Sequence, residues 1–243
     1  MMRIVLRRWG VFVLTMMSFM ANRSPAAEVE VLLDPTEALA RLSEKEFDIV
    51  VTDLRMEGVD GIHILEHIME HCEHTRVILI TGAGDAIGTA VALACAERGG
   101  TIILLGRTVH KLETVYDEIK NNGGPEPAIY PMNLEGASAD DYDELNTNID
   151  REFGRLDGLF NNAGWLGAST PIEIYDTELW YKVMQVNLQG PYMLTKYCIP
   201  LLKKSAHASL LFMTDDKFGA YWDAYTVSKS GLNGLTQVLA AEY

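Results

Sequence analysis

The sequence predicts an α/β fold with a doubly wound parallel sheet of the Rossmann-like kind, preceded by a second α/β segment. Two observations lead to this class. Residues 77–88 place an apolar strand, a glycine-rich turn and a helix start in direct succession, which is how proteins build a dinucleotide pyrophosphate site. After residue 88, short apolar runs alternate with helix-prone segments. Alternation of this kind gives parallel sheets with right-handed crossovers.

The expected elements of the C-terminal part follow one another as strand and helix. Apolar, β-prone runs are expected to be strands, and runs with apolar residues three or four apart are expected to be helices. In chain order they are strand 77–81, helix 89–97, strand 99–106, helix 109–121, strand 128–132, helix 140–153, strand 156–160, one or two helices over 179–202 with a break near Gly190-Pro191, strand 209–213 and helix 224–243.

The first 76 residues predict a separate βαβαβ pattern that ends in the strand 77–81. Its elements are strand 28–33, helix 34–42 with Asp34 as N-cap, strand 47–52 and helix 63–71. Residues 1–27 allow two descriptions. One is a strand at 3–6 with a buried helix at 11–21, and the other is a signal peptide, since arginines precede an apolar run and small residues follow it. We favour the first and therefore expect a cytoplasmic protein.

Composition argues against several classes of function. The 243 residues carry a formal net charge of −14, and an acidic surface argues against nucleic acid as a partner. The three cysteines lack the spacing of a metal site or a disulfide framework. Three histidines share one face of the helix 63–71, and we interpret them as a solvated surface, so no metal is expected. The apolar run 9–20 is too short to span a membrane.

Two side chains near the C-terminus are suited to proton transfer. Tyr225 and Lys229 stand four residues apart in a predicted helix, so both project from one face. A tyrosine alone has a pKa of about 10, which is too high for efficient proton exchange at neutral pH. A nearby ammonium group favours the phenolate and lowers that pKa. Taken alone, the pair is compatible with proton transfer, but an exposed helical pair without a catalytic role is the favoured interpretation.

Residues 77–243 resemble the short-chain dehydrogenase/reductase family. The motifs that carry the resemblance are Thr81-Gly-Ala-Gly-Asp-Ala-Ile-Gly88, Asn161-Asn-Ala-Gly164, Asn187 within Val186-Asn-Leu-Gln-Gly190, and Tyr225-Thr-Val-Ser-Lys229. The resemblance implies an oxidoreductase that transfers hydride between a nicotinamide coenzyme and a small carbonyl/alcohol substrate. It implies Tyr225 as acid/base, Lys229 also on the nicotinamide ribose, and Asn187 holding a water in the proton relay. It further implies a homodimer formed through the long helices.

The resemblance also implies which residues contact the coenzyme. Arg107 follows the second strand of this part, where an acidic residue would accept from the ribose 2′-hydroxyl of NAD; an arginine there favours NADP, with NAD as the weaker alternative. Asn161–Gly164 are expected to lie over the adenine side of the coenzyme and to steady the sheet. The full set of expected contacts is Thr81, Gly82, Gly84, Asp85, Ala86, Ile87, Gly88, Arg107, Asn133, Leu134, Asn162, Ala163, Gly164, Tyr225 and Lys229.

Three positions depart from the family pattern. Ala86 replaces the middle glycine of the turn, and Asn133 replaces the acidic residue after the third strand. Asp216 stands three residues before Gly219, at the place of the active-site serine. A carboxylate cannot donate to a substrate carbonyl, and it repels a developing oxyanion. The sequence also ends inside its last helix, so we expect the family's last strands to be missing. A catalytically impaired nucleotide-binding protein is therefore an alternative.

A second resemblance lies in the N-terminal third. Asp48-Ile-Val-Val-Thr-Asp-Leu-Arg-Met56, followed by Gly58-Val-Asp-Gly-Ile62, is similar to the phosphoacceptor region of response-regulator receiver domains. This resemblance implies Asp53 as the phosphoacceptor, and hence a phosphorelay signalling protein as a further alternative. Arg8 stands where that family has one of its Mg²⁺-binding acidic residues, which favours a degenerate receiver.

The two patterns share the strand 77–81, and a strand has only two edges. In a dehydrogenase-type sheet both edges are occupied, so the strand 47–52 cannot pair there. We therefore expect two units. Residues 1–76 are an incomplete receiver-like (flavodoxin-like) segment that forms a loosely attached three-stranded layer or is poorly ordered. Residues 77–243 are the coenzyme-binding Rossmann unit.

Overall fold

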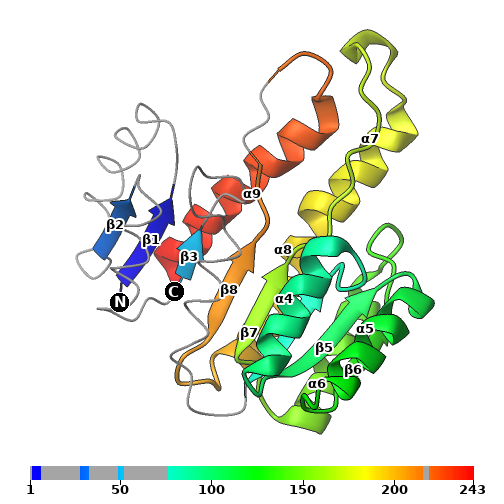
Figure 1. Cartoon of the computed structure of the whole chain (residues 1–243). Coiled ribbons are helices and arrows are strands. Elements are labelled where there is room, and N and C mark those ends of the chain that lie inside the picture. Colours follow the sequence, from blue (N-terminus) through cyan, green and yellow to red (C-terminus); the bar gives the residue numbers. More distant parts are fainter. Residues whose placement is uncertain (1, 7–27, 33–48, 52–75, 216–218) are drawn as a thin grey trace.

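The structure is a computed structural model of the whole chain, and it describes residues 2–6, 28–32, 49–51, 76–215 and 219–243. Within these residues every strand pair is parallel. Helices cover the larger of the two sheets (Figure 1). The predicted α/β fold class is thereby confirmed.

The larger sheet has five strands in the order β6-β5-β4-β7-β8. The order reverses at β4, since the chain adds β5 and β6 on one side and β7 and β8 on the other, as in a Rossmann-like sheet. The strands are β4 (Val77–Thr81), β5 (Thr101–Gly106), β6 (Ala128–Pro131), β7 (Gly158–Asn161) and β8 (Ser209–Phe212). The helices are α4 (Ala86–Glu97), α5 (Val109–Asn121), α6 (Ala139–Phe153), α7 (Thr177–Met184), α8 (Gly190–Leu202) and α9 (Asp223–Glu242), with a 3₁₀ turn η1 (Ile172–Ile174) and a π-helical turn η2 (Gln185–Gln189).

The side chains of β4 alternate between two apolar layers. Ile78 and Ile80 belong to the layer that contains the buried residues of α4 and α5. Val77 and Leu79 belong to the opposite layer, which contains the buried residues of α6, α8 and α9. A strand that is covered on both faces needs apolar residues at successive positions. This requirement explains why the sequence of β4 is a continuous apolar run.

The pairing of β4 decides between the two patterns that share it. Residues 101–105 pair with one edge and residues 158–160 with the other. Strand β3 (Ile49–Val51) instead pairs with β1 (Met2–Leu6), in a separate parallel sheet of order β2-β1-β3. The remaining strand β2 is Glu28–Leu32. The predicted priority of the dehydrogenase-type pairing is therefore confirmed.

The other features predicted for the N-terminal part lie outside the described residues. They are the helices at 34–42 and 63–71, the apolar run at 9–20 and the phosphoacceptor candidate Asp53. The order β2-β1-β3 is that of the first three strands in flavodoxin-like sheets.

A π-helical turn divides the long helical region after β7. The sequence predicted an interruption near Gly190-Pro191, and α8 begins at Gly190 with Pro191 in its first turn. Proline has no amide hydrogen to donate to the helix ladder, and a π-turn accommodates one additional residue without ending the helical path. The turn η2 carries Asn187, whose side chain is fully buried.

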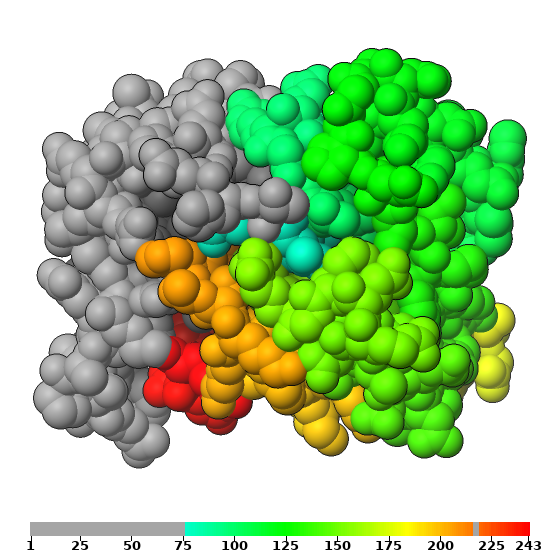
Figure 2. Space-filling model, turned by 90° about the horizontal axis from the view of Figure 1, so that it is seen from below, coloured from blue at the N-terminus to red at the C-terminus, as the bar shows by residue number. Residues whose placement is uncertain are grey.

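Asp157 joins the segments at the end of the sheet where the strands begin. Its buried carboxylate accepts hydrogen bonds from the amide of Val77 at 2.9 Å, the hydroxyl of Ser205 at 2.7 Å and the guanidinium of Arg155 at 3.0 Å. Burial by itself raises the pKa of this carboxyl, but these hydrogen bonds and the charge of Arg155 outweigh it and hold the pKa below its ordinary value. Figure 2 shows this end of the molecule, where the segments that lead into β4, β7 and β8 meet.

Replacing Asp157 by alanine is expected to lower the free energy of unfolding by about 3 kcal/mol, because buried donors lose their shared acceptor. Urea denaturation at neutral pH measures this loss. Since the pKa is lowered in the folded state, the carboxylate stabilises the fold above its ordinary pKa, and the difference between wild type and variant shrinks as the pH falls below that value. Asp150→Ala is the control, because its ion pair with Lys204 is half exposed and is worth about 1 kcal/mol at most. Equal losses in the two variants would contradict the assignment.

Candidate active site

The turn after β4 is closed by glycines that no other residue can replace without strain. Gly82 has a φ of +63°, a conformation that residues with a Cβ rarely adopt. A Cβ on Gly88 would lie 2.2 Å from the carbonyl oxygen of Gly82, so the first turn of α4 packs directly on the turn. The absence of side chains at Gly82 and Gly88 thus lets a ligand approach the backbone at the start of α4.

The N-terminus of α4 has no side-chain cap. Its N-cap residue, Asp85, makes no side-chain hydrogen bond to the helix. Its carboxylate instead accepts from the ammonium group of Lys111 at 2.6 Å. The first amide groups of a helix have no partner within the helix, and with the positive end of the helix dipole they attract anions. The turn therefore has the geometry of a phosphate site.

A cleft of about 170 Å³ opens beside this turn. Arg107 and Lys111 stand at its rim, and both are exposed. Trp165 and Val186 also line it. The predicted coenzyme residues that line the cleft are Gly82, Gly84, Asp85, Arg107, Asn133, Leu134, Ala163 and Gly164. The structure thus brings residues from the ends of β4, β5, β6 and β7 to one place.

Thr81 and Asn162 connect the two central strands at their carboxyl ends. The hydroxyl oxygen of Thr81 accepts from the amides of Asn162 and Ala163 at 2.9 and 2.8 Å. The side-chain amide of Asn162 donates to the carbonyl of Thr81 at 3.0 Å and to that of Gly82 at 3.3 Å. These hydrogen bonds join the end of β4 to the segment after β7. The steadying role predicted for residues 161–164 requires such a connection.

Asn187 fixes the segment that follows β7. Its Oδ1 accepts from the amide of Trp165 at 2.7 Å, and its Nδ2 donates to the carbonyl of Trp165 at 2.8 Å and to the hydroxyl of Ser228 at 3.1 Å. These bonds use both amide hydrogens, and the side chain is fully buried. In this structure Asn187 therefore positions backbone, while its predicted role of holding a water stays a prediction.

Tyr225 and Lys229 share one face of α9, and an acidic residue joins them. The phenol of Tyr225 donates to Oδ2 of Asp215 at 2.9 Å. The ammonium group of Lys229 donates to the carbonyl of Met213 at 2.7 Å and lies 5.8 Å from the centre of the Tyr225 ring. Near Gly164 the backbone approaches Lys229 so closely that an added Cβ would lie 3.3 Å from its Nζ. The pair therefore stands at the end of β8, beside the cleft.

Burial changes the acidity of Lys229. Only 3% of this residue is exposed. Loss of hydration disfavours the ammonium form and lowers the pKa to about 8, although the negative charge of Asp215 acts in the opposite direction. Lys229 therefore keeps its proton at neutral pH and releases it in mildly alkaline solution.

Sequence reasoning missed two functional candidates. It pointed to Asp216 by counting back from Gly219, and Asp216 lies outside the described residues. The acidic group that contacts Tyr225 is the neighbouring Asp215, which counting forward from the end of β8 would have found. It also missed Lys111, which its position in the first turn of α5, beside the carboxyl end of β5, could have indicated.

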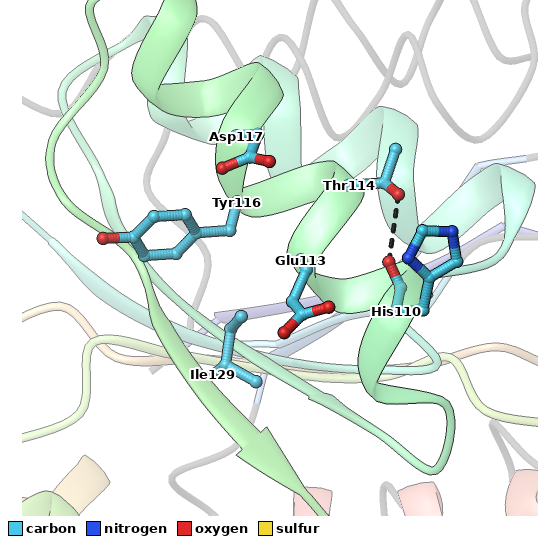
Figure 3. Close-up of a pocket in the computed structure, with 6 residues that line it drawn as sticks. All are labelled: His110, Glu113, Thr114, Tyr116, Asp117 and Ile129. Carbon is cyan, nitrogen blue, oxygen red and sulfur yellow. Dashed lines mark hydrogen bonds between the residues drawn. The ribbon is translucent and has the colours of Figure 1, made fainter.

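A second hollow, of about 400 Å³, lies along the outer side of α5 (Figure 3). Five of its six lining residues come from this helix, and the drawn hydrogen bond joins the Thr114 hydroxyl to the backbone carbonyl of His110. The carboxylates of Glu113 and Asp117 make the hollow acidic. In the part of the chain that the structure describes, no three acidic, histidine or cysteine side chains gather as a metal site would need.

The model of the short chain dehydrogenase family matches residues 76–243. The chain belongs to this family. It is 40% identical over 172 residues to the uncharacterized oxidoreductase YciK of Escherichia coli, covering 69% of this chain and 68% of that protein. It is 32% identical to the short chain dehydrogenase mpl6 of Monascus purpureus, covering 70% of this chain and 61% of that protein.

The model of the response regulator receiver domain matches residues 11–102, so the second resemblance is also confirmed.

Solved structures give the same assignment. A short chain dehydrogenase from Pseudomonas syringae shares 47% identity with a TM-score of 0.67, covering 69% of each chain. One from Shigella flexneri, solved with NADP, shares 38% identity with a TM-score of 0.67, covering 69% of this chain and 72% of that one. Another from Escherichia coli, solved with NADPH, shares 40% identity at the same TM-score and covers 69% and 71%. Among the described helices, none is long and apolar enough to cross a membrane.

The lowered pKa of Lys229 predicts how stability depends on pH. The folded lysine has a pKa of about 8, against an ordinary value of 10.5, so between these values the unfolded chain binds more protons and stability rises with pH. Relative to Lys229→Met, the wild type should gain on the order of 3 kcal/mol across this window. Urea denaturation of both proteins at several pH values measures the gain. Lys196→Met, at an exposed position of α8, should show none, and a flat difference for Lys229→Met would refute the burial argument.

Proposed function

We propose that the protein is an NADP(H)-dependent oxidoreductase that transfers hydride between the coenzyme and a small molecule, the family's carbonyl/alcohol pair being the substrate class that the resemblance implies. The observation that carries the proposal is the shared position of two features. The phosphate-site turn follows β4, and the Tyr225–Lys229 pair stands at the carboxyl end of β8 in the same sheet, with β7 between them. Gly164, which follows β7, lines the cleft and lies beside the ammonium group of Lys229. A coenzyme bound over the turn can therefore extend toward the phenol.

The chain's own residues fit a dinucleotide phosphate. The uncapped start of α4 offers amide groups to the pyrophosphate. Arg107 and Lys111 place two cations at the end of β5, where the adenine ribose lies in Rossmann-like sheets. No carboxylate ends β5 to accept from a ribose 2′-hydroxyl, since the strand stops at Gly106 and Arg107 follows. This arrangement favours NADP over NAD, as in the relatives solved with NADP and NADPH.

The proposed chemistry assigns one task to each polar residue near α9. NADP(H) supplies or accepts the hydride when it is bound. Tyr225 holds the proton that the substrate heteroatom gains or loses. Lys229 holds its proton at neutral pH and favours the phenolate by its charge. In this structure the phenol hydrogen points to Asp215, so donation to a substrate requires Tyr225 to exchange that partner.

We also propose a cytoplasmic homodimer. The supporting observation is a set of large apolar side chains on the long helices that the family uses for pairing, each more than 40% exposed: Tyr192 on α8, and Val227 and Val238 on α9.

A second function has support from Asp215. Its carboxylate accepts the phenol hydrogen of Tyr225 and cannot donate to a substrate carbonyl as a serine hydroxyl would. This favours a protein that binds the coenzyme but does not turn over a carbonyl substrate.

Replacing Arg107 by leucine is expected to weaken NADPH binding by about 10- to 100-fold, because a charge-assisted contact to the 2′-phosphate is lost. NADH binding should change by no more than about threefold, since NADH lacks that phosphate. Titration of nicotinamide fluorescence with both coenzymes measures the two effects. Arg151→Leu, on the remote helix α6, is the control. Tighter binding of NADH than of NADPH to the wild type would overturn the assignment of NADP.

Replacing Tyr225 by phenylalanine is expected to reduce turnover of a carbonyl substrate by about 100-fold or more, because the hydroxyl that exchanges the proton with its oxygen is removed. NADPH binding should change much less than turnover, because Tyr225 does not line the cleft beside the glycine turn. Steady-state kinetics and fluorescence titration give the two quantities. Tyr221→Phe is the matched control, since Tyr221 is exposed and close in sequence. Full turnover by the Tyr225 variant would exclude the phenol as acid/base.

A further inference from the structure

A carboxylate stands at the point where the substrate must meet Tyr225. Asp215 follows β8 and accepts the phenol hydrogen of Tyr225 at 2.9 Å. Both residues are partly exposed. Lys229, which lies beside the Tyr225 ring, is 3% exposed, and its ammonium group donates to the carbonyl of Met213 at 2.7 Å. A substrate that enters here therefore contacts the carboxylate and the phenol before it contacts the ammonium group.

This arrangement is unfavourable for a carbonyl substrate. When hydride adds to a carbonyl carbon, negative charge develops on the oxygen, and catalysis depends on donors aimed at that oxygen. Asp215 offers only acceptor oxygens when it is ionised, and the phenol hydrogen is directed at Asp215. A negative charge within a few ångströms of the developing oxyanion raises its energy. The same charge would favour a reacting group that is positive before the hydride arrives.

We infer that the reacting bond of the substrate is a protonated carbon–nitrogen double bond, an iminium ion, whose N–H group donates to the Asp215 carboxylate. The inference rests on the proposed use of NADP(H) and replaces the carbonyl by its nitrogen counterpart. An imine nitrogen is much more basic than a carbonyl oxygen, so it carries its proton into the site. The charge of Asp215 then stabilises the bound cation.

The reaction balances without an additional proton donor. The hydride that NADPH supplies forms the new C–H bond, the π electron pair of the C=N bond becomes the lone pair of nitrogen, and the product is a neutral amine. NADPH is oxidised to NADP⁺, and the iminium carbon is reduced. No oxyanion forms, so the absence of a donor at Asp215 has no cost for this chemistry. The phenol of Tyr225 positions Asp215 through its hydrogen bond.

A matched pair of small probes tests the inference. With the full-length protein and NADPH, reduction of 2-methyl-1-pyrroline should proceed with a kcat/KM at least about tenfold above that of cyclopentanone. Asp215→Ser, which restores a neutral hydroxyl, should reverse this preference. Asp117→Asn, an exposed acid on α5, should leave it unchanged. A wild type that reduces the ketone as well as the imine, or neither of them, overturns the inference.

A binding measurement separates this inference from the proposed function. The protonated form of 2-methylpyrrolidine should bind to the coenzyme-free protein in calorimetry, and Asp215→Asn should weaken that binding by about tenfold, because the carboxylate charge is removed. Neutral cyclopentanol should bind wild type and variant equally. Cation binding that does not depend on Asp215 overturns the inference even where NADPH binds. A failure of NADPH to bind in the fluorescence titration refutes the proposed function, whatever the cation does.

Discussion

Strand β4 can form backbone hydrogen bonds along two edges only, and β5 and β7 occupy both of them. This pairing puts the glycine turn after Thr81 at the middle of the sheet, where the strand order reverses. A crevice opens at such a point because the connections on its two sides leave in opposite directions. The Thr81 hydroxyl then binds the two halves together by accepting from the amides of Asn162 and Ala163. The cleft beside the glycine turn depends on β4 and β7 ending side by side.

The polar groups around α9 act on one another in opposite ways. Burial disfavours the charged form of Lys229, and the carboxylate of Asp215 favours it. The same carboxylate accepts the phenol hydrogen of Tyr225. A neutral hydroxyl at this position would leave the phenol hydrogen available for a substrate but would give Lys229 no charge to offset its burial. Asp215 therefore acts on both members of the pair, through a hydrogen bond to Tyr225 and through its charge on Lys229.

The sequence was most informative where the backbone itself forms the site. The turn at Gly82 and Gly88 requires glycine for steric reasons, so its position, the strand before it and the helix after it were all predictable. The contact between Asp215 and Tyr225 was not, because it joins the end of β8 to α9 and depends on how these two elements pack. Lys111 was missed because its partner Asp85 stands 26 residues earlier, and only the packing of α5 against the turn brings them together. The π-turn depends on hydrogen-bond register, which the proline position indicates only in part.

The receiver-like part loses a strand to the larger sheet, and this loss also bears on its chemistry. The order β2-β1-β3 is that of a flavodoxin-like sheet, in which the fourth strand would pair next to β3. Strand β8 lies there instead, and it belongs to the other sheet (Figure 1). The strand that both resemblances share ends at the hydroxyl residue Thr81. In this fold that hydroxyl accepts two backbone amides, and Thr81 is only 1% exposed. Both edges of β4 and its terminal hydroxyl are thus used within the larger sheet, and this arrangement favours the dehydrogenase-type pairing over the receiver-type pairing.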